Sequence, residues 1–561
     1  MHGGPLSTET VESGSPEFSL ANYQPKLAMR LISWSGNHAG DRVWKKDATF
    51  WPQANPNDVA TRLGWLTLPE TMAPQAADLR DFAQAVRADG FEHVVLFGMG
   101  GSSLAPEVFA RTFGPAPGFP DLTVLDSTHP AAVTARVPAE TLGKTLFVVS
   151  SKSGTTLEPN AFFRYAWAKA GGPSGSPGKQ FIAITDPGTP LAQLAEERHF
   201  RRCFLATPDV GGRYSALTAF GMVPFALLGH DPAGLLSAAG EMARWCGPSV
   251  PVDSNPGLRL GAALGELTVA HRDKVVFVTS PGIRAFPSWV EQLIAESLGK
   301  QGRGIVPVPS EPNATDPMGR RDMLLVRLRM RGEQDPATES ALDAASHAGV
   351  PVLRFEVDGP LGLGPEIFRW EFAIAVAGAI IGVNPFDQPD VELAKELARQ
   401  AMRGGDGSKA PAPPDALSLA DPATVPRLTA WIDSARAGDY IAIQAFLAPT
   451  ESVAQGIEEL AVRLRARSAL ATTFGFGPRF QHSTGQMHKG GPPIGLFLQL
   501  TDLPTADVEV PEMSISFARI LAAQAAGDAQ ALAQKAQRIV RVNVGADAAT
   551  GLRALATAFG P

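Results

Sequence analysis

The spacing of hydrophobic and polar residues changes at about residue 90. Before that point short helical patterns dominate, as at 59–65 and 76–88. From Val94 onward, short apolar runs rich in β-branched residues are each followed by Gly, Ser or Thr and then by a helical stretch. Continuous apolar runs separated by helices are typical of a parallel sheet covered on both faces. The runs that predict this first sheet are 93–98, 122–126, 145–150, 181–186 and a shorter fifth run at 204–206.

A second series of the same kind starts near residue 260. It ends with an apolar helix from about Pro365 to Gly382, whose longest apolar run is too short to cross a bilayer and predicts a buried helix. The stretch 403–414 has the composition of a linker, and a third α/β segment follows it. The strands predicted for these two regions are 274–280, 304–308, 323–330 and 352–357, then 440–447, 470–477, 495–501 and 538–545.

These patterns predict an α/β protein with two doubly wound, mostly parallel sheets flanked by helices, plus a C-terminal α/β segment. Residues 1 to about 20 are expected to be disordered, and the helical patterns up to residue 90 to form a cap. The predicted divisions are 1–90 for this tail and cap, 91–255 and 256–402 for the two sheet domains, and 415–561 for the C-terminal segment.

Composition narrows the possible partners. The net charge of −7 gives no general attraction to nucleic acid or anionic membranes, so an anionic substrate must be captured by a local site. The only cysteines, Cys203 and Cys246, exclude a disulfide scaffold and a Cys-rich metal site, and they fit a reduced cytoplasm. No signal-peptide core is visible in residues 1–18, and no cluster has metal-ligand spacing. We therefore expect a cytoplasmic protein that binds no metal, nucleic acid or membrane.

A hydroxyl-rich turn at 151–156 is the clearest candidate binding site. It joins a predicted strand to a helix that begins near Leu157, and helix N-termini offer unpaired N–H groups and a positive dipole end. Such a turn suits a phosphate, although Ser and Thr also cap many helices that bind no ligand. The turn lacks the G-x-x-x-x-G-K-[ST] pattern, which argues against a nucleoside triphosphate. Its residues are Ser151, Lys152, Ser153, Gly154, Thr155 and Thr156.

The earlier turn, 98–103, raises the possibility of a dinucleotide. However, Ser103 stands where the third glycine of G-x-G-x-x-G belongs, and Asp126 lies too far along the chain to match the ribose-binding acid. We therefore expect no nucleotide cofactor.

Three further motifs carry a family resemblance. Residues 211–215 match the G-G-R-[FY]-S signature of glucose-6-phosphate isomerases, and 296–300 resemble the E-S-x-G-K segment of the short bacterial enzymes. Residues 384–395 resemble the second signature, F-D-Q-x-G-V-E-x-x-K, except that Asp390 replaces the usual Gly or Ala. With the two turns, these motifs identify the chain as similar to the glucose-6-phosphate isomerase family, which is built from sugar isomerase (SIS) domains.

The likeness is greatest to the isomerase half of bifunctional transaldolase/glucose-6-phosphate isomerases, and it covers about 40 to 550. It runs from 42–51 and 62–66 through 482–492. No residues are left for a separate transaldolase domain, so that activity is not expected.

The resemblance implies reversible isomerisation of glucose-6-phosphate to fructose-6-phosphate through ring opening and an enediolate, without a cofactor. Helical spacing places Glu296 on a partly apolar stripe with Trp289, where burial would raise its pKa, and the resemblance makes it the candidate base. A structural salt bridge to Lys300 is the alternative. Glu291 falls on the opposite face and is expected to be solvated. Arg213 would stabilise the enediolate, or else form an interdomain ion pair.

The remaining roles also follow from the resemblance. Ser151, Lys152, Ser153 and Thr156 would contact the phosphate, and Gly100, Gly101 and Ser102 would lie near the sugar. No histidine follows the E-S-x-G-K segment, but H-S-T-G-Q occurs at 482–486. We expect His482 to open the sugar ring from this displaced position, with Lys395 assisting at the ring oxygen and His488 and Lys489 as nearby substitutes.

Two other functions stay open. A phosphoglucose/phosphomannose isomerase would use the same chemistry with a looser pocket at C2. A non-catalytic SIS regulator would need the phosphate turn but not Glu296, Arg213 and Lys395 together. Family members are typically dimers with sites built partly by the neighbouring subunit, so the resemblance also implies a homodimer.

Overall fold

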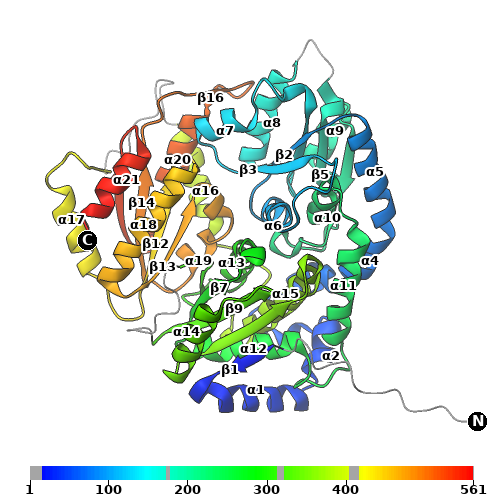
Figure 1. Ribbon diagram of the computed structural model, residues 1–561, viewed down its shortest axis with the longest axis vertical. Helices are drawn as coiled ribbons and strands as arrows, with labels where there is room; N and C mark the ends of the chain where they lie inside the picture. Colours follow the sequence, from blue (N-terminus) through cyan, green and yellow to red (C-terminus); the bar gives the residue numbers. More distant parts are fainter. Residues whose placement is uncertain (1–15, 172–176, 312–320, 404–415, 560–561) are drawn as a thin grey trace, which may run out of the picture.

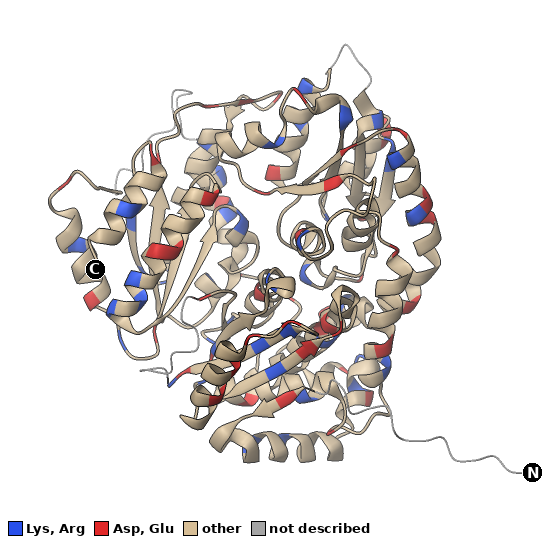
Figure 2. Cartoon of the chain, in the orientation of Figure 1, with Lys and Arg blue, Asp and Glu red and all other residues tan. Residues whose placement is uncertain are grey.

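The computed structural model describes residues 16–171, 177–311, 321–403 and 416–559 (Figure 1). Residues 1–15 of the predicted tail and all but the first residue of the predicted linker lie outside these ranges. Figure 2 shows acidic and basic residues spread over all parts of the molecule rather than gathered on one part. Among the described helices, none combines the length and apolar character that a membrane span requires.

The first sheet has five parallel strands in the order β3-β2-β4-β5-β6. The sequence predicted all five, with ends shifted by no more than two residues. Because β2 pairs with both β3 and β4, the order reverses beside β2, and ligands of doubly wound sheets bind at such a switch point. The strands are β2 (His93–Phe97), β3 (Asp121–Leu125), β4 (Thr145–Ser150), β5 (Phe181–Thr185) and β6 (Arg202–Leu205).

The N-terminal region and the first unit contribute the following helices. They are α1 (Gln24–Gly36), α2 (Ala39–Trp44), α3 (Pro56–Arg62), α4 (Leu68–Met72), α5 (Ala76–Ala88), α6 (Leu104–Phe113), α7 (Pro130–Arg136), α8 (Leu157–Lys169), α9 (Pro190–Glu197), α10 (Ala219–Leu227) and α11 (Pro232–Trp245). Of these, α1 packs against α12 (Pro256–Val269) and α11 packs against α15 (Leu363–Ile381), and both partners belong to the second unit.

The second sheet has the order β1-β10-β9-β7-β8. Its edge strand β1 (Glu17–Ser19) pairs antiparallel with β10, so the prediction of disorder up to about residue 20 was wrong for 17–19. Phe18 explains the ordering, because its ring packs on Phe355 of β10 with centroids 6.1 Å apart. The parallel strands are β7 (Lys274–Thr279), β8 (Val306–Val308), β9 (Met323–Met330) and β10 (Val352–Val357).

The helices of the second unit are α12 (Pro256–Val269), α13 (Phe286–Leu298), α14 (Pro336–His347), α15 (Leu363–Ile381) and α16 (Val391–Arg403). As predicted, α15 is buried; it packs against α11, α12 and α13 and carries the fully buried Trp370.

The third sheet, β11-β17-β14-β12-β13, is parallel, and its four long strands follow the same order as four parallel strands in each of the other two sheets. Its four long strands were predicted, whereas the two-residue β11 was not. The strands are β11 (Leu417–Ser418), β12 (Tyr440–Phe446), β13 (Ala471–Phe476), β14 (Gly495–Thr501) and β17 (Arg538–Asn543), with a separate hairpin of β15 (Glu509–Val510) and β16 (Ile515–Ser516). The helices are α17 (Thr424–Asp433), α18 (Glu451–Ser468), α19 (Gly485–Gly490), α20 (Phe517–Gln534) and α21 (Ala548–Thr557).

The three sheet units surround a common centre (Figure 1). There α13 of the second unit contacts α6 of the first and α19 of the third, and α16 packs along α20. The centre is therefore the place where residues from all three units can meet.

Candidate active site

A cleft of about 1060 Å³ opens at this centre, and residues of all three units line it. Of the predicted site residues, all but Ser151 reach its wall. Those that line the cleft are Gly100, Gly101, Ser102, Lys152, Ser153, Thr156, Arg213, Glu296, Lys395 and His482.

The hydroxyl-rich turn lies at the switch point of the first sheet, between β4 and α8. Thr156 occupies the N-cap position of α8, but its side chain caps no N–H group. Its hydroxyl instead accepts a hydrogen bond from Ser151 Oγ at 3.1 Å. Ser153 and Thr155 are exposed beside it, and their hydroxyls lie 3.0 Å apart. The first turn of α8 therefore lacks a side-chain cap and faces a wall of hydroxyls, an arrangement suited to an anion.

Two residues of the turn differ from the prediction. Ser151 is buried behind Thr156 and does not line the cleft, because its hydroxyl bonds Thr156 instead. Lys152 lines the cleft, but its ammonium donates to Asp186 Oδ2 at 2.5 Å. Burial lowers the pKa of Lys152, and Asp186 opposes that effect. The side chain of Lys152 thus already has an anionic partner.

The turn after β2 brings the first and third units into contact. Gly100 has a φ of +54°, and a Cβ there would lie 2.6 Å from the carbonyl oxygen of His482 and 2.7 Å from Gln292 Nε2. Only glycine fits this approach without strain. A Cβ at Gly101 would lie only 1.9 Å from the carbonyl oxygen of Gly212, which precedes Arg213. The glycines predicted to lie near the sugar therefore also let the loops carrying Arg213 and His482 reach the cleft.

Glu296 is buried in α13 beside Trp289, as predicted. Burial raises the pKa of Glu296, while Arg213 and a hydrogen bond from Gln292 oppose the rise. The alternative ion pair with Lys300 does not form, since that ammonium contacts Asp387 Oδ1 at 2.7 Å. Glu296 is thus a buried carboxylate on the cleft wall and is not bound to the lysine one turn away.

The prediction that Glu291 is solvated was wrong. Its side chain is half-buried, and burial raises its pKa to about 8, with Arg479 opposing. Arg479 also binds Glu107 of α6 and approaches Asp126 at 3.1 Å. The outer face of α13 is therefore covered by a neighbouring unit, which the spacing within one helix could not reveal.

Arg213 lies in a short 3₁₀ turn, Gly212–Tyr214, and is buried. Its Nη1 lies 3.7 Å from Glu296 Oε2, and its Nε donates to Ser297 Oγ at 2.8 Å. The carbonyl oxygens of Pro385 and Asp387 accept from its Nη2. The guanidinium is thus a fixed positive charge next to the Glu296 carboxylate, and it also ties the first unit to the second.

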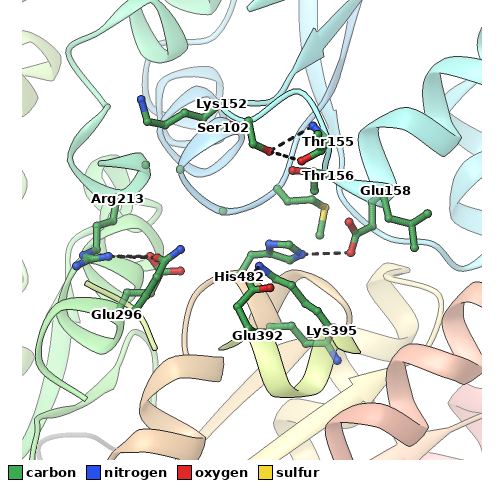
Figure 3. A pocket seen from close by; sticks show the side chains of 18 of the residues that line it. Ser102, Lys152, Thr155, Thr156, Glu158, Arg213, Glu296, Glu392, Lys395 and His482 are labelled. Carbon is green, nitrogen blue, oxygen red and sulfur yellow. Dashed lines mark hydrogen bonds and ion pairs between the residues drawn. The ribbon is translucent and has the colours of Figure 1, made fainter. Parts of the chain in front are cut away.

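His482 ends a 3₁₀ turn, Arg479–His482, that follows β13. Its Nε2 lies 3.2 Å from Glu158 Oε1 (Figure 3). Burial alone would raise the pKa of Glu158, but His482 outweighs it and the net pKa is lowered. Gln524 donates to the same Oε1 at 2.7 Å and accepts from Thr128 Oγ1 at 2.7 Å. An ionised carboxylate, itself held by two further side chains, therefore orients the imidazole.

Sequence reasoning missed Glu158 and Gln524. One feature of the sequence could have indicated Glu158, since it is the only acidic residue in the first turn of the helix after the hydroxyl-rich turn. Gln524 carried none, because it comes from α20 in a different unit. Other cleft residues not singled out from the sequence include Asp58, Arg62, Arg164, Gln292 and Gln388.

Lys395 points into the cleft from α16, beside His482 (Figure 3). Its ammonium contacts Glu392 Oε1 at 2.8 Å, one turn earlier on the same helix. The side chain is partly exposed, so the ammonium can exchange this surface partner for a ligand.

The two proposed substitutes for His482 do not reach the cleft. His488 is buried against Phe497, with ring centroids 5.0 Å apart, and burial lowers its pKa well below the usual histidine range. Lys489 is buried in an ion pair with Asp528 at 2.6 Å. Both belong to the interior of the third unit, because α19 turns their side chains away from the cleft.

Chemically, the cleft has a hydroxyl-rich turn suited to an anion at one end and two sets of ionisable groups. One set is Glu296 with Arg213, and the other is His482 with Glu158 and Lys395; Figure 3 shows the two on opposite sides. Within the ranges that the structure describes, no three His, Cys, Asp or Glu side chains are placed to share a metal ion. The groups present can exchange protons with a bound anion and stabilise negative charge that develops on it.

Comparisons with known proteins agree with this chemistry. A family model described as phosphoglucose isomerase matches residues 67–304. A probable glucose-6-phosphate isomerase of Natronomonas pharaonis is 32% identical over 430 residues, covering 69% of this chain and 96% of its own. The glucose-6-phosphate isomerase of Rubrobacter xylanophilus is 30% identical over 395 residues, covering 60% of this chain and 89% of its own.

Solved structures show the same fold. A hypothetical protein from Thermus thermophilus aligns with a TM-score of 0.60 at 25% identity, covering 69% of this chain and all of that one. A glucose-6-phosphate isomerase from Chlamydia trachomatis aligns with a TM-score of 0.52 at 20% identity, covering 70% and 89%.

Proposed function

Because this chain belongs to the phosphoglucose isomerase family, we propose that its cleft interconverts glucose-6-phosphate and fructose-6-phosphate. One observation carries the proposal. Glu296, a buried carboxylate of raised pKa, lies 3.7 Å from the permanent cation of Arg213 and opposite the His482–Glu158 pair in the same cleft. Aldose–ketose isomerisation needs such a base, a charge stabiliser and a ring-opening pair in one site.

The phosphate binds at the hydroxyl-rich turn. Ser153, Thr155 and Thr156 offer hydroxyls there, and the start of α8 adds the N–H of Leu157. Arg62, which lines the cleft and lowers the pKa of Lys152 through its charge, adds positive potential at this end. Anchoring the phosphate leaves the sugar carbons between the two sets of acid–base groups.

Ring opening uses His482 and Lys395. Ionised Glu158 can only accept a hydrogen bond, so it holds the Nε2–H of His482 and leaves Nδ1 for the substrate. In the aldose, Nδ1 takes the proton of the anomeric hydroxyl, and the ring oxygen takes a proton as its bond to C1 breaks. Lys395 donates at that oxygen. The product is the open-chain aldehyde.

Proton transfer uses Glu296. Its carboxylate takes the proton from C2, and the C–H electron pair becomes the C1–C2 double bond while negative charge moves to O1. Arg213 stabilises this enediolate. The proton of the O2 hydroxyl then passes to O1, Glu296 returns its proton to C1, and the C2 carbonyl forms. Atoms and charge balance without a metal or nucleotide.

Several finer points remain predictions. Tolerance for mannose-6-phosphate is one, and the relative turnover of the two hexose phosphates measures it. The likeness to the isomerase half of a transaldolase fusion, the homodimer and the cytoplasmic location rest on the sequence alone. A purely regulatory role is the weaker alternative, since it requires neither Glu296 nor His482.

The test compares fructose-6-phosphate with its 5-deoxy analogue, which lacks the hydroxyl that closes the ring, and follows aldose formation by NMR. The wild type is expected to convert both. His482→Ala is expected to lose about a hundred-fold or more of its turnover on fructose-6-phosphate and far less on the analogue. His347→Ala, which removes an exposed histidine of α14, should match the wild type. A wild type that converts neither substrate would end the proposal, and equal losses of His482→Ala on both would remove His482 from ring opening.

A further inference from the structure

Asp390 is the position at which this chain departs from the second isomerase signature. It stands directly before α16, the helix that carries Lys395. Its Oδ2 accepts a hydrogen bond from Gln486 Nε2 at 2.8 Å, and its Oδ1 accepts one from Lys535 Nζ at 2.6 Å. Both partners belong to the third unit. Because Gly or Ala offers neither contact, the departure adds a connection between α16 and the third unit.

The amide of Gln486 forms the centre of this connection, and it is fully buried. Its Oε1 accepts from the main-chain N–H of Asp390 at 2.9 Å, and its Nε2 also donates to the carbonyl oxygen of Gly299 at 3.0 Å. Turning the amide over would face its oxygen toward two acceptors and its NH₂ toward a donor, so only one orientation satisfies all three contacts. One amide thus joins the start of α16 to the end of α13, which carries Glu296.

The backbone beside this amide packs with no spare room. A Cβ at Gly490 would lie 2.3 Å from Asp390 Oδ2 and 2.7 Å from the carbonyl oxygen of Gly299. Residue 490 can therefore carry no side chain while Asp390 and Gly299 keep their places. The short helix α19 is wedged between α13 and α16.

The same segment carries His482. Its carbonyl oxygen accepts from Gln292 Nε2 of α13 at 2.9 Å, and its ring meets Glu158. Segment 482–486 is therefore held at its start by Gln292 and Glu158 and at its end by Asp390 and Gly299. His482 comes from the third unit, and no neighbouring residue in the sequence links it to Lys395 on α16. Its position relative to Lys395 therefore depends on the contacts at the end of segment 482–486.

We propose that Asp390 is a positioning residue, which fixes the His482 segment against α16 so that His482 and Lys395 meet the same sugar ring. The assignment rests on the proposed function, since it places Asp390 in support of ring opening. Loss of the carboxylate lets α16 and segment 482–486 move relative to each other. Glu296 and Arg213 keep their own contact, and Arg213 keeps its bonds to Ser297 and to the 385–388 loop, so proton transfer in an open-chain sugar is spared.

The test again uses fructose-6-phosphate and its 5-deoxy analogue. Asp390→Gly, which introduces a residue usual in the family, is expected to lose about ten-fold or more of kcat on fructose-6-phosphate while staying within about two-fold of the wild type on the analogue. Lys535→Gln removes the outer partner of Asp390 but leaves Gln486, and it should stay within about two-fold on both substrates.

Asp390→Asn keeps an oxygen that can accept from Gln486, so its loss should lie between those of the wild type and Asp390→Gly. If Asp390→Gly does not fold, Asp390→Asn provides the same comparison of the losses on fructose-6-phosphate and on the 5-deoxy analogue. Equal losses on both substrates, or no loss on either, would overturn the proposal in a protein whose wild type is active. A wild type inactive on both substrates would instead refute the proposed function itself.

Discussion

Glu296 and Glu158 are carboxylates of one cleft whose surroundings move their pKa values in opposite directions. Burial raises the pKa of Glu296, and Arg213 only partly offsets the rise. For Glu158 the nearby His482 outweighs burial, and the pKa is lowered. A raised pKa suits a group that must take and return a proton, whereas a lowered one suits a permanent anion that orients an imidazole.

The pH dependence of Arg213→Gln tests this assignment at the residue scale. Arg213 lowers the pKa of Glu296 against burial, so its removal should raise that pKa further. Because Glu296 must be ionised to take a proton, kcat/KM should begin to fall at a higher pH on the acid side. Turnover should also drop by about a hundred-fold, since the enediolate loses its cation.

Arg399→Gln serves as the control, because it makes the same change at an exposed position of the same cleft. Its acid limb should coincide with that of the wild type. If the acid limb of Arg213→Gln is not shifted, Glu296 is not the group whose ionisation sets that limb.

At the scale of elements, the buried helix α15 contains an acidic side chain, Glu371, which is unusual inside a protein. Glu371 is fully buried, and neither of its carboxylate oxygens has a hydrogen-bond partner within the described ranges. Burial raises its pKa well above the usual value. The folded protein therefore keeps a proton that the unfolded chain releases above its ordinary carboxyl pKa of about 4.3. Stability supplied by this group is complete below that pH and falls as the pH rises toward the folded pKa.

Glu371→Gln should remove this dependence, because glutamine has nearly the same shape and does not titrate. From pH 5 to pH 8, the melting temperature of the variant should fall less than that of the wild type. Glu241→Gln, an exposed change on α11, should follow the wild type. Parallel curves for Glu371→Gln and the wild type would mean that Glu371 is ionised in the folded protein.

At the scale of the whole molecule, the cleft combines contributions of three units whose sheets share the order of four parallel strands. The first supplies the hydroxyl turn, Glu158 and Arg213, the second Glu296 and Lys395, and the third His482. All of these groups come from a single chain. The third unit therefore forms part of the site itself, and the Asp390–Gln486 contact joins it to the helix of Lys395.

The sequence could predict features that depend on neighbouring residues, but not contacts between segments that lie far apart in the chain. The sequence predicted the strands and indicated Glu296, Arg213 and His482 as candidates, because apolar runs and motifs are local signals, and all three candidates line the cleft. The burial of Glu291, the pairing of Lys152 with Asp186 and the contact of Glu158 with His482 were not. Each of those depends on a second segment that lies far away in the sequence, so neither spacing nor composition carries a trace of it.

The central claim is that Glu296 carries the proton between C2 and C1. Its most direct test is the loss of deuterium from C2 of [2-²H]glucose-6-phosphate, followed by NMR in water. The wild type should release or transfer the label. Glu296→Gln should slow this by about a thousand-fold while still binding the sugar phosphate in calorimetry, and Glu291→Gln on the same helix should retain the exchange. Loss of the label by Glu296→Gln at the wild-type rate would contradict the account.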